Sequence, residues 1–496
     1  MTFLNRIEET GNRLPDPATL FVIGTGIIMV LSWVATSMSW EVHSDLTGTL
    51  ISQNLLSSEG IWWLLSNMVN NFITFPPLAI VLVGMLGIGL AERSGFLPAL
   101  LRRSILLVPQ SLLTPATIFL GIMSSMALDA GYVVLPPIAA ALYIAAGRSP
   151  LVGIAAVFAG ISAGFSANLL ITALDPLLSG LTQTAAQILV ENYQVAVTAN
   201  WWFMLASTIL LTLVGWAATA WFVEPRVGLD HDLVTDKDQL INLEDSNEKK
   251  GLIRAILATG IALIITALFI TIPGAPLYGA GSHFSRWIEA TVPLLFILFF
   301  IPGIVFGLST GKIKNDKQVV KMLGDTIAHL GPYIVMAFFA AQFIECFKYT
   351  GLGKMLAITG GQWLVAMEFN ASMLLTGFIL MAMSANLLIG SASAKYAFMA
   401  PVFVPMLMQV GFSPELTQIA YRIGDSVTNV ITPMNPYMII VLVELQRYRK
   451  NAGFGTLIAL MLPYTVVFAV VWIAMLLIWM NIGLPLGPSG ELFINL

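Results

Sequence analysis

Arg422, Asp425 and Asn429 place a cation, a carboxylate and an amide three and four residues apart within the predicted membrane crossing Leu416–Leu445. At this spacing the three side chains share one face of a helix. Charged side chains within apolar segments of membrane type cost roughly 2.5–3.5 kcal/mol each on insertion scales, so each requires a reason. Arg422 can pair with Asp425 or bind a substrate carboxylate through two parallel hydrogen bonds. A purely structural ion pair is the alternative.

Further polar side chains interrupt apolar runs elsewhere and complete a candidate binding site. The set predicted from these residues is Asn168, Asp175, Asn386, Ser393, Tyr396, Arg422, Asp425 and Asn429. Tyr396 can stack on an aryl ring or serve as packing. Asp175 binds ligand or forms a turn before Pro176 near the outer interface. Lys395 can snorkel or pair rather than bind a ligand.

We predict that a coupling ion binds near the same residues. Asp425, Asn386 and Asn429 offer oxygen atoms where helices break, which suits a sodium ion. Proton coupling through Asp129 or Asp175 is the alternative, and Asp129 can also be a residue near water at a hairpin tip. We expect no other cofactor.

The composition places these residues in a membrane protein. Of 496 residues, 57% are hydrophobic and 10% charged, and the mean hydropathy is +0.85. Soluble domains carry about 25% charged residues, so the chain's solvent is the lipid bilayer. A net charge of −4 without a Lys/Arg-rich run argues against a nucleic-acid partner. The single cysteine, Cys346, excludes an internal disulfide and a cysteine-based metal site.

Apolar runs predict an all-α integral membrane protein with nine crossings and two re-entrant helical hairpins. The predicted crossings are Leu20–Ser39, Met68–Leu90, Leu151–Leu174, Trp201–Val223, Ala255–Ile272, Thr291–Leu308, Met322–Cys346, Leu416–Leu445 and Leu457–Asn481. The hairpins are expected at 115–146 and 371–410, and broken helices at 151–176 and 416–445. The N-terminal half is 1–223, a cytoplasmic linker spans 224–254, and the C-terminal half is 255–496.

Positive charge sets the predicted orientation. Eighteen of the 23 Lys and Arg residues fall on one side in this layout, which makes that side and the N-terminus cytoplasmic. The first hairpin then enters from the cytoplasm and the second from outside. Five crossings separate the hairpins, so the two halves are predicted to be inverted repeats.

A repeated stretch supports the two-half organisation. Tyr132–Gly160 aligns with Tyr396–Gly424 without a gap, and seven of 29 positions are identical. Paired interruptions of apolar segments in two halves are the best sequence indication of a secondary transporter's binding site. The positions matching Arg422 and Asp425 are Phe158 and Ile161, so the repeat does not require the charges.

Two motifs are distinctive. One runs Arg422-Ile423-Gly424-Asp425 through Asn429 to Asn435-Pro436-Tyr437, and the other is Ser391-Ala392-Ser393-Ala394-Lys395-Tyr396. Both resemble motifs of the AbgT family of bacterial p-aminobenzoyl-glutamate transporters. The segment Arg13-Leu14-Pro15-Asp16-Pro17 resembles the family too, and the likeness covers essentially the whole chain. Family members have tryptophan where this chain has Tyr396.

The resemblance implies a dimeric protein of the bacterial inner membrane with nine spans and two hairpins. It also implies import of p-aminobenzoyl-glutamate or export of sulfonamide-type antimetabolites. The family's site residues match Asp175, Asn386, Ser393, Pro414, Arg422 and Asp425 here.

The favoured function is therefore ion-coupled transport of aryl-amide glutamates. A sodium-coupled di- or tricarboxylate symporter is the alternative within transport. An enzyme is disfavoured because the sequence contains no catalytic dyad or metal motif, and a channel because it contains no repeated filter.

Overall fold

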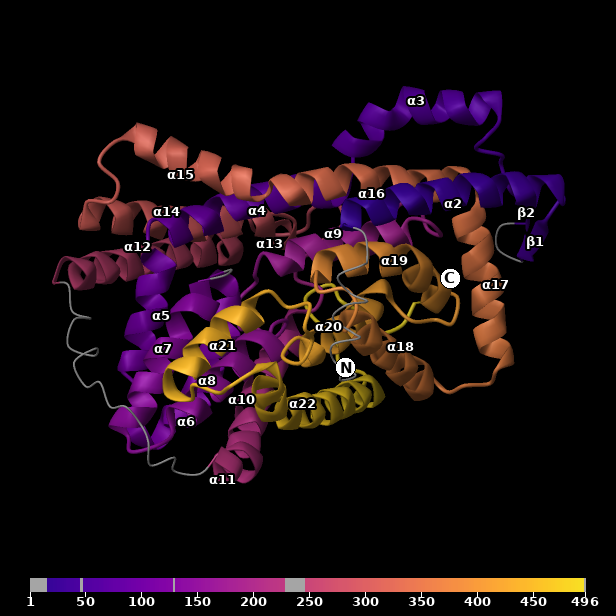
Figure 1. Cartoon of the computed structure of the whole chain (residues 1–496). Helices are drawn as coiled ribbons and strands as arrows, with labels where there is room; N and C mark the ends of the chain where they lie inside the picture. Colours follow the sequence, from indigo (N-terminus) through magenta and orange to yellow (C-terminus); the bar gives the residue numbers. More distant parts are fainter. Residues whose placement is uncertain (1–15, 45–47, 128–129, 228–245, 495–496) are drawn as a thin grey trace.

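The computed structural model describes residues 16–44, 48–127, 130–227 and 246–494, and these are mainly helical (Figure 1). The helices up to the linker are α2 (Pro17–Ser37), α3 (Ser58–Ile73), α4 (Pro76–Arg93), α5 (Phe96–Leu106), α6 (Leu113–Met123), α7 (Ala130–Ala145), α8 (Pro150–Phe158), α9 (Leu174–Ala186), α10 (Trp201–Ala218) and α11 (Glu224–Val227). Those after it are α12 (Ser246–Thr271), α13 (Arg286–Glu289), α14 (Thr291–Thr310), α15 (Asp316–His329), α16 (Gly331–Tyr349), α17 (Leu352–Ala366), α18 (Ala371–Asn386), α19 (Ala392–Met408), α20 (Pro414–Thr428), α21 (Tyr437–Tyr448) and α22 (Phe454–Ile482).

Several helices are long and apolar enough to cross a bilayer. Within the described residues there are six such spans, or up to eight if each of two bent helix pairs counts as one. The most exposed is α12, of whose most apolar 18-residue window only 11% is buried, as expected for a helix that faces lipid. The chain is a multi-pass helical membrane protein.

Five predicted crossings correspond to single helices, whereas others are interrupted. The region of the predicted crossing Met322–Cys346 consists of α15 and α16, bent by 47° at Leu330. Gly331 and Pro332 follow that bend, and a proline at the start of a helix lacks the N–H that would continue the preceding one. The predicted crossing Met68–Leu90 likewise contains a break, between α3 and α4, before Pro76-Pro77.

Two pairs of helices occupy the positions of the predicted hairpins. The first is α6 and α7, and the second is α18 and α19. A broken segment follows each pair. After α8 a π-helical turn, Ala159–Ala163, leads into irregular backbone that ends at α9, and after α20 irregular backbone ends at α21.

In both repeats a glycine ends the second hairpin helix and a proline begins the helix that follows. Gly147 after α7 and Gly411 after α19 both have left-handed φ angles, +72° and +93°. Such angles strain other residues and suit the end of a helix. Pro150 and Pro414 then open α8 and α20, at the first helical position that proline favours.

Several parts of the fold were not predicted, among them most of α9, which extends to Ala186 beyond the predicted broken helix 151–176. A short antiparallel hairpin pairs β1 (Glu41–Ser44) with β2 (Gly48–Ile51), and α17 forms a further helix between α16 and the second hairpin. In both cases the segment is too short or too mixed in composition to stand out as a crossing.

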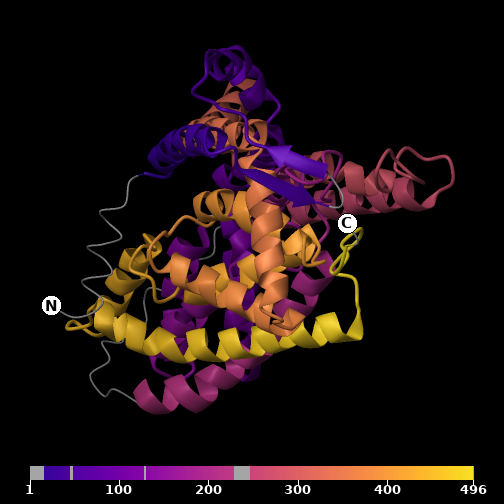
Figure 2. The same ribbon diagram turned by 90° about the vertical axis from the view of Figure 1, so that its right-hand side faces the viewer.

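The helices fall into two groups. The long helices pack in pairs, α2 with α16 and α4 with α14, and α12 lies against α14 (Figure 1). The hairpins and broken helices gather on one side of this group, and α22 runs along their far side (Figure 2). α20 lies among them and is buried over its whole length, Pro414–Thr428, in contact with α18, α19, α9 and α22.

Candidate functional site

The buried helix α20 carries the charged residues of the candidate site. Its first turn is fixed by Ser413, whose side chain accepts a hydrogen bond from the Leu416 backbone N–H. The helix ends at Thr428, ahead of Thr432-Pro433 and Asn435-Pro436, where proline prevents continuation. Between these points Arg422 and Asp425 are 2% and 1% exposed.

Arg422 pairs with Asp175, across the two halves of the chain. The Nη1 atom lies 2.7 Å from Asp175 Oδ1, and Nη2 donates to the Ser166 carbonyl oxygen at 3.1 Å. The interpretation that pairs Arg422 with Asp425 is therefore wrong in this structure. The two residues share a helix face, but each is drawn to a partner on a different neighbouring element.

Asp175 is a buried partner rather than an exposed turn residue, with 7% of its surface accessible. Its Oδ2 atom accepts hydrogen bonds from the Thr172 backbone N–H at 2.7 Å and from the Thr172 hydroxyl at 2.9 Å. These bonds fix the carboxylate at the start of α9, directly after the irregular backbone of the first half. One carboxylate oxygen therefore binds Arg422, while the other is bonded to Thr172 in the irregular backbone before α9.

Asp425 pairs with Lys395 of the second hairpin. The Lys395 Nζ atom lies 2.6 Å from Asp425 Oδ1 and also donates to Asn386 Oδ1. Lys395 is 1% exposed, so this ammonium group is enclosed and does not reach the interface by snorkelling. The pair ties α18 and α19 of the hairpin to α20.

Asn386 links the hairpin to the end of α20. Its Nδ2 group donates to the Asp425 carbonyl oxygen at 2.6 Å, to Thr428 Oγ1 at 2.9 Å and to Asn429 Oδ1 at 2.9 Å. Asp425, Asn386 and Asn429 thus lie together, as the sodium prediction requires. The Lys395 ammonium, however, contacts two of the predicted oxygen ligands. The sodium site stays a prediction, and it competes with a fixed positive charge.

Tyr396 is enclosed by the core. It is fully buried, its ring centroid lies 4.3 Å from that of Tyr421, and its hydroxyl lies 2.7 Å from Thr182 Oγ1. Thr182 Oγ1 in turn donates to Gln418 Oε1 at 3.0 Å. In this conformation the ring packs between elements, so its predicted stacking on a ligand requires a different arrangement and stays a prediction.

The first half places its predicted residues in a corresponding way. Asn168 is 2% exposed and donates through Nδ2 to Ser125 Oγ at 3.0 Å, beside the tip of the first hairpin. Asn429 of the second half is bonded to Asn386, at the tip of the second hairpin. In each half an amide of the break therefore contacts its own hairpin. Asp129 lies outside the described residues.

Ser393 and Pro414 are not brought to the charged pairs by any described contact. Ser393 lies in the first turn of α19, where its Oγ atom is 3.3 Å from Ser391 Oγ. Pro414 opens α20, about two helical turns before Arg422. Their predicted roles in ligand binding remain predictions.

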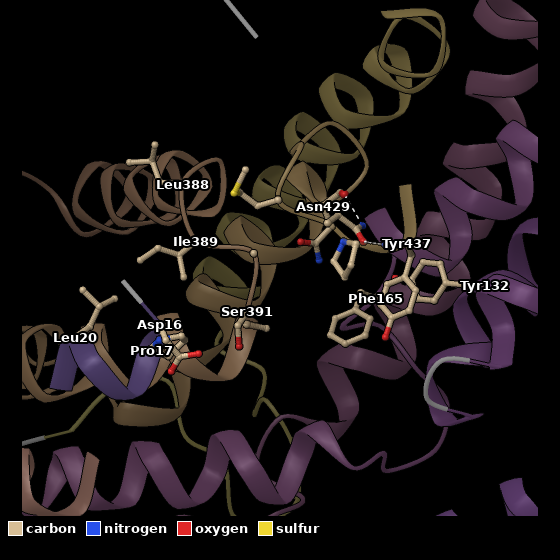
Figure 3. Close-up of a pocket in the computed structure, with 15 residues that line it drawn as sticks. Asp16, Pro17, Leu20, Tyr132, Phe165, Leu388, Ile389, Ser391, Asn429 and Tyr437 are labelled. Carbon is tan, nitrogen blue, oxygen red and sulfur yellow. Dashed lines mark hydrogen bonds between the residues drawn. The ribbon is translucent and has the colours of Figure 1, made fainter. Parts of the chain in front are cut away.

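A cavity lies beside this constellation, between the second hairpin tip, the start of α7 and the two breaks (Figure 3). It has a volume of about 530 Å³. The second hairpin tip, Leu388 to Ala392, forms one wall, and Tyr132, Phe165 and Tyr437 belong to another. Asn429 and Asn435 also line it. Of the predicted substrate-binding residues, Asn429 is the one that borders this space.

Further polar residues continue the site along α20. Glu415 accepts a hydrogen bond from the Tyr193 hydroxyl at 3.0 Å, and the Tyr421 hydroxyl lies 3.3 Å from Asp425 Oδ1. Glu415, Gln418 and Arg422 are spaced by three and four residues, the same kind of spacing that singled out Arg422, Asp425 and Asn429. Extending that face toward the start of the helix would have found Glu415 and Gln418.

Residues 2–494 match the model of the AbgT putative transporter family. The chain belongs to the AbgT family. It is 34% identical over 487 residues to the p-aminobenzoyl-glutamate transport protein of Escherichia coli (strain K12), an alignment that covers 97% of this chain and 95% of that protein. The resemblance noted in the sequence is thereby confirmed.

Two solved structures of transporters are similar to this AbgT-family chain throughout. The YdaH transporter of Alcanivorax borkumensis matches with a TM-score of 0.92 at 39% identity, covering 96% of this chain and 100% of its own. MtrF of Neisseria gonorrhoeae, which represents a class of antimetabolite efflux pumps, matches with a TM-score of 0.92 at 40% identity. The match covers 99% of this chain and 100% of the MtrF chain. The AbgT-family chain is therefore a transporter of a small molecule and not an enzyme.

Proposed function

We propose that this protein is an ion-coupled secondary transporter that carries p-aminobenzoyl-glutamate, exports sulfonamide-type antimetabolites, or does both. The ligand binds between the hairpin tips and the broken helices. The names of the relatives support this ligand class, because one is a p-aminobenzoyl-glutamate transport protein and another represents antimetabolite efflux pumps.

The observation that carries the proposal is the pair of buried ion pairs on α20. Arg422–Asp175 joins the two halves of the chain, and Lys395–Asp425 joins the second hairpin to α20; both pairs lie beside a cavity. Removing charges from water costs several kcal/mol per ion, and a well-packed apolar replacement is often as stable. Folding stability therefore does not explain why these charged residues are present, whereas recognition of an anionic ligand does.

Arg422 has the features needed to read a carboxylate. Its Nη1 and Nη2 groups bond to Asp175 and Ser166, and its buried Nε atom has no hydrogen-bond partner among the described residues. A ligand carboxylate that displaces Asp175 would receive two parallel hydrogen bonds from the guanidinium. Exchange between an internal and a ligand carboxylate would couple ligand binding to movement between the halves.

The finer architecture belongs to the same proposal. We infer nine crossings and two hairpins arranged as inverted repeats, with the N-terminus in the cytoplasm and two protomers forming a dimer in the bacterial inner membrane. The TM-scores of 0.92 to two transporters support a common architecture. The split of basic residues supports the orientation, because cytoplasmic segments carry the excess of Lys and Arg.

The test is transport by the full-length protein in proteoliposomes. Tritiated p-aminobenzoyl-glutamate and a labelled sulfonamide are offered separately, under an imposed sodium gradient, an imposed proton gradient, and neither. We expect gradient-stimulated movement of at least one ligand, and no inhibition by excess citrate or succinate. Transport of the dicarboxylates in place of the aryl ligands would contradict the proposal.

A further inference from the structure

The cavity presents different side chains from those that the sequence singled out. In this conformation Tyr396 is fully buried and Arg422 is 2% exposed, and neither is among the residues that line the cavity. The walls carry Tyr132, Phe165 and Tyr437 instead (Figure 3). These three are the aromatic side chains that a ligand in this cavity can contact.

Tyr132 and Tyr437 form a stacked pair at the cavity. Their ring centroids are 4.0 Å apart and their planes differ by 8°. Tyr132 is 5% exposed and is fixed from another side by Phe158, with centroids 6.2 Å apart. Tyr437 is the more exposed ring, and it is half-buried. A ring that is already held by its neighbour loses little freedom when a ligand ring packs against it.

Two asparagines fix the position of Tyr437. The Tyr437 backbone N–H donates to Asn435 Oδ1 at 3.0 Å. Asn435 Nδ2 donates to Ser162 Oγ at 3.0 Å and to the Asn429 carbonyl oxygen at 2.9 Å. Ser162 belongs to the π-helical turn of the first half. The backbone position of Tyr437 thus depends on both broken helices.

We propose that Tyr437, backed by Tyr132, is the aryl-binding wall of the substrate cavity in this conformation. It takes the p-aminophenyl ring that p-aminobenzoyl-glutamate and sulfonamides share. This inference rests on the proposed function and adds to it a specific ring contact. The cavity has a volume of about 530 Å³. Sites for small molecules typically enclose several hundred cubic ångströms, so a ligand of this class fits the space.

The repeat supplies a second argument. Tyr132 and Tyr396 occupy matching positions in the two aligned stretches. Tyr132 lies at the cavity, whereas Tyr396 is closed off against Tyr421 with its hydroxyl beside Thr182. Half-sites related by such repeats open alternately to opposite faces of the membrane. The Tyr132–Tyr437 pair therefore serves this conformation, and the Tyr396–Tyr421 pair serves the opposite one.

Equilibrium binding to the full-length protein in lipid nanodiscs tests the assignment. The probe is tritiated p-aminobenzoyl-glutamate, and N-acetylglutamate, which lacks the ring, serves as competitor. Tyr437→Phe keeps the ring and should bind within twofold of wild type. Tyr437→Leu should bind about threefold to tenfold more weakly, the loss expected for an aromatic contact. Tyr278→Leu, at a tyrosine that is 44% exposed outside the core, is the matched control and should bind as wild type.

The outcomes separate this inference from the proposed function. If wild type binds the probe and Tyr437→Leu binds it equally well, the ring contact is overturned while the transported ligand class stands. If wild type binds neither the probe nor a sulfonamide, both are overturned. Should Tyr437→Leu fail to fold, Tyr437→Trp keeps an aromatic ring. Ligand-dependent quenching of its added fluorescence supports the assignment, and unchanged fluorescence at saturating probe overturns it.

Discussion

The two repeats of this transporter share a packing frame and differ in charge. Gly160 of the first repeat and Gly424 of the second occupy matching positions, and each allows a hairpin helix to cross the following helix closely. A Cβ at Gly160 would lie 2.4 Å from the Ile118 carbonyl oxygen, and one at Gly424 would lie 2.6 Å from the Ile379 carbonyl oxygen. The same geometry is therefore built twice.

The charges break this equivalence. Arg422 and Asp425 match Phe158 and Ile161, and one residue before the aligned stretch the same alignment matches Lys395 with Gly131. The first half contributes its carboxylate, Asp175, from outside the aligned stretch. The comparison indicates that the glycine and proline frame is common to both repeats, whereas Arg422, Asp425 and Lys395 of the proposed site occur in the second repeat alone.

The largest expected effect is the loss of folding when Gly160 or Gly424 of the shared packing frame is replaced. Gly424→Leu and Gly160→Leu should both prevent stable folding, because the new side chain meets backbone atoms that cannot move aside. The smaller changes Gly424→Ala and Gly160→Ala should each lower the free energy of unfolding by about 1–3 kcal/mol. Thermal unfolding in detergent and size-exclusion profiles measure the effect.

Gly377 provides the matched control for the frame. It lies in the second hairpin helix, α18, and a Cβ there has no neighbour within 4 Å. Gly377→Ala should leave stability unchanged or raise it by up to about 1 kcal/mol. If Gly424→Ala is tolerated as well as Gly377→Ala, the close crossing is not what the repeat preserves.

The next largest effect is expected at Arg422. Arg422→Ala should abolish transport, and it should also destabilise the protein by about 3–5 kcal/mol because a buried charge is left without its partner. That charge is the carboxylate of Asp175. Parallel measurement of transport and thermal unfolding separates the two effects. Arg102 forms a partly exposed ion pair with Glu248, and the control Arg102→Ala should change stability by less than about 1 kcal/mol.

The Arg422 pair shows which parts of the site the sequence could and could not predict. The match to Phe158 suggested that the fold does not need the charge, since the repeat is built without it. Helical spacing correctly placed Arg422 and Asp425 on one helix, because that relation is local. The contact with Asp175 spans 247 residues, and no local pattern specifies which buried carboxylate an arginine meets.

The same division holds for the fold. Gly147, Gly411, Pro150 and Pro414 mark helix ends through backbone geometry, so the positions of these helices were predictable. The burial of Tyr396 and the stacking of Tyr132 on Tyr437 depend on tertiary packing. The repeat identified Tyr132 and Tyr396 as equivalent, but it did not indicate that they would have different surroundings.

A smaller effect on transport is expected at Lys395, although Lys395→Met, like Arg422→Ala, leaves a buried carboxylate unpaired and should lower stability. Lys395→Met removes the ammonium group that contacts Asp425 and Asn386, and frees oxygen atoms of the predicted sodium site. The variant should transport more slowly at low sodium and recover at high sodium at fixed pH, whereas wild type should depend less on sodium. Initial rates in proteoliposomes measure this, with Lys354→Met on α17 as control. A variant with the sodium dependence of wild type would remove these oxygens from the coupling site.

The central claim is that the charges of the second repeat, and not the shared frame, perform transport. The double variant Asp175→Asn with Arg422→Met tests it most directly. It removes both members of one ion pair, so no buried charge is left unpaired. Its thermal stability and its uptake of p-aminobenzoyl-glutamate are measured in the same preparation. We expect stability close to wild type and no transport. Transport at the wild-type rate by this stable double variant would contradict the account.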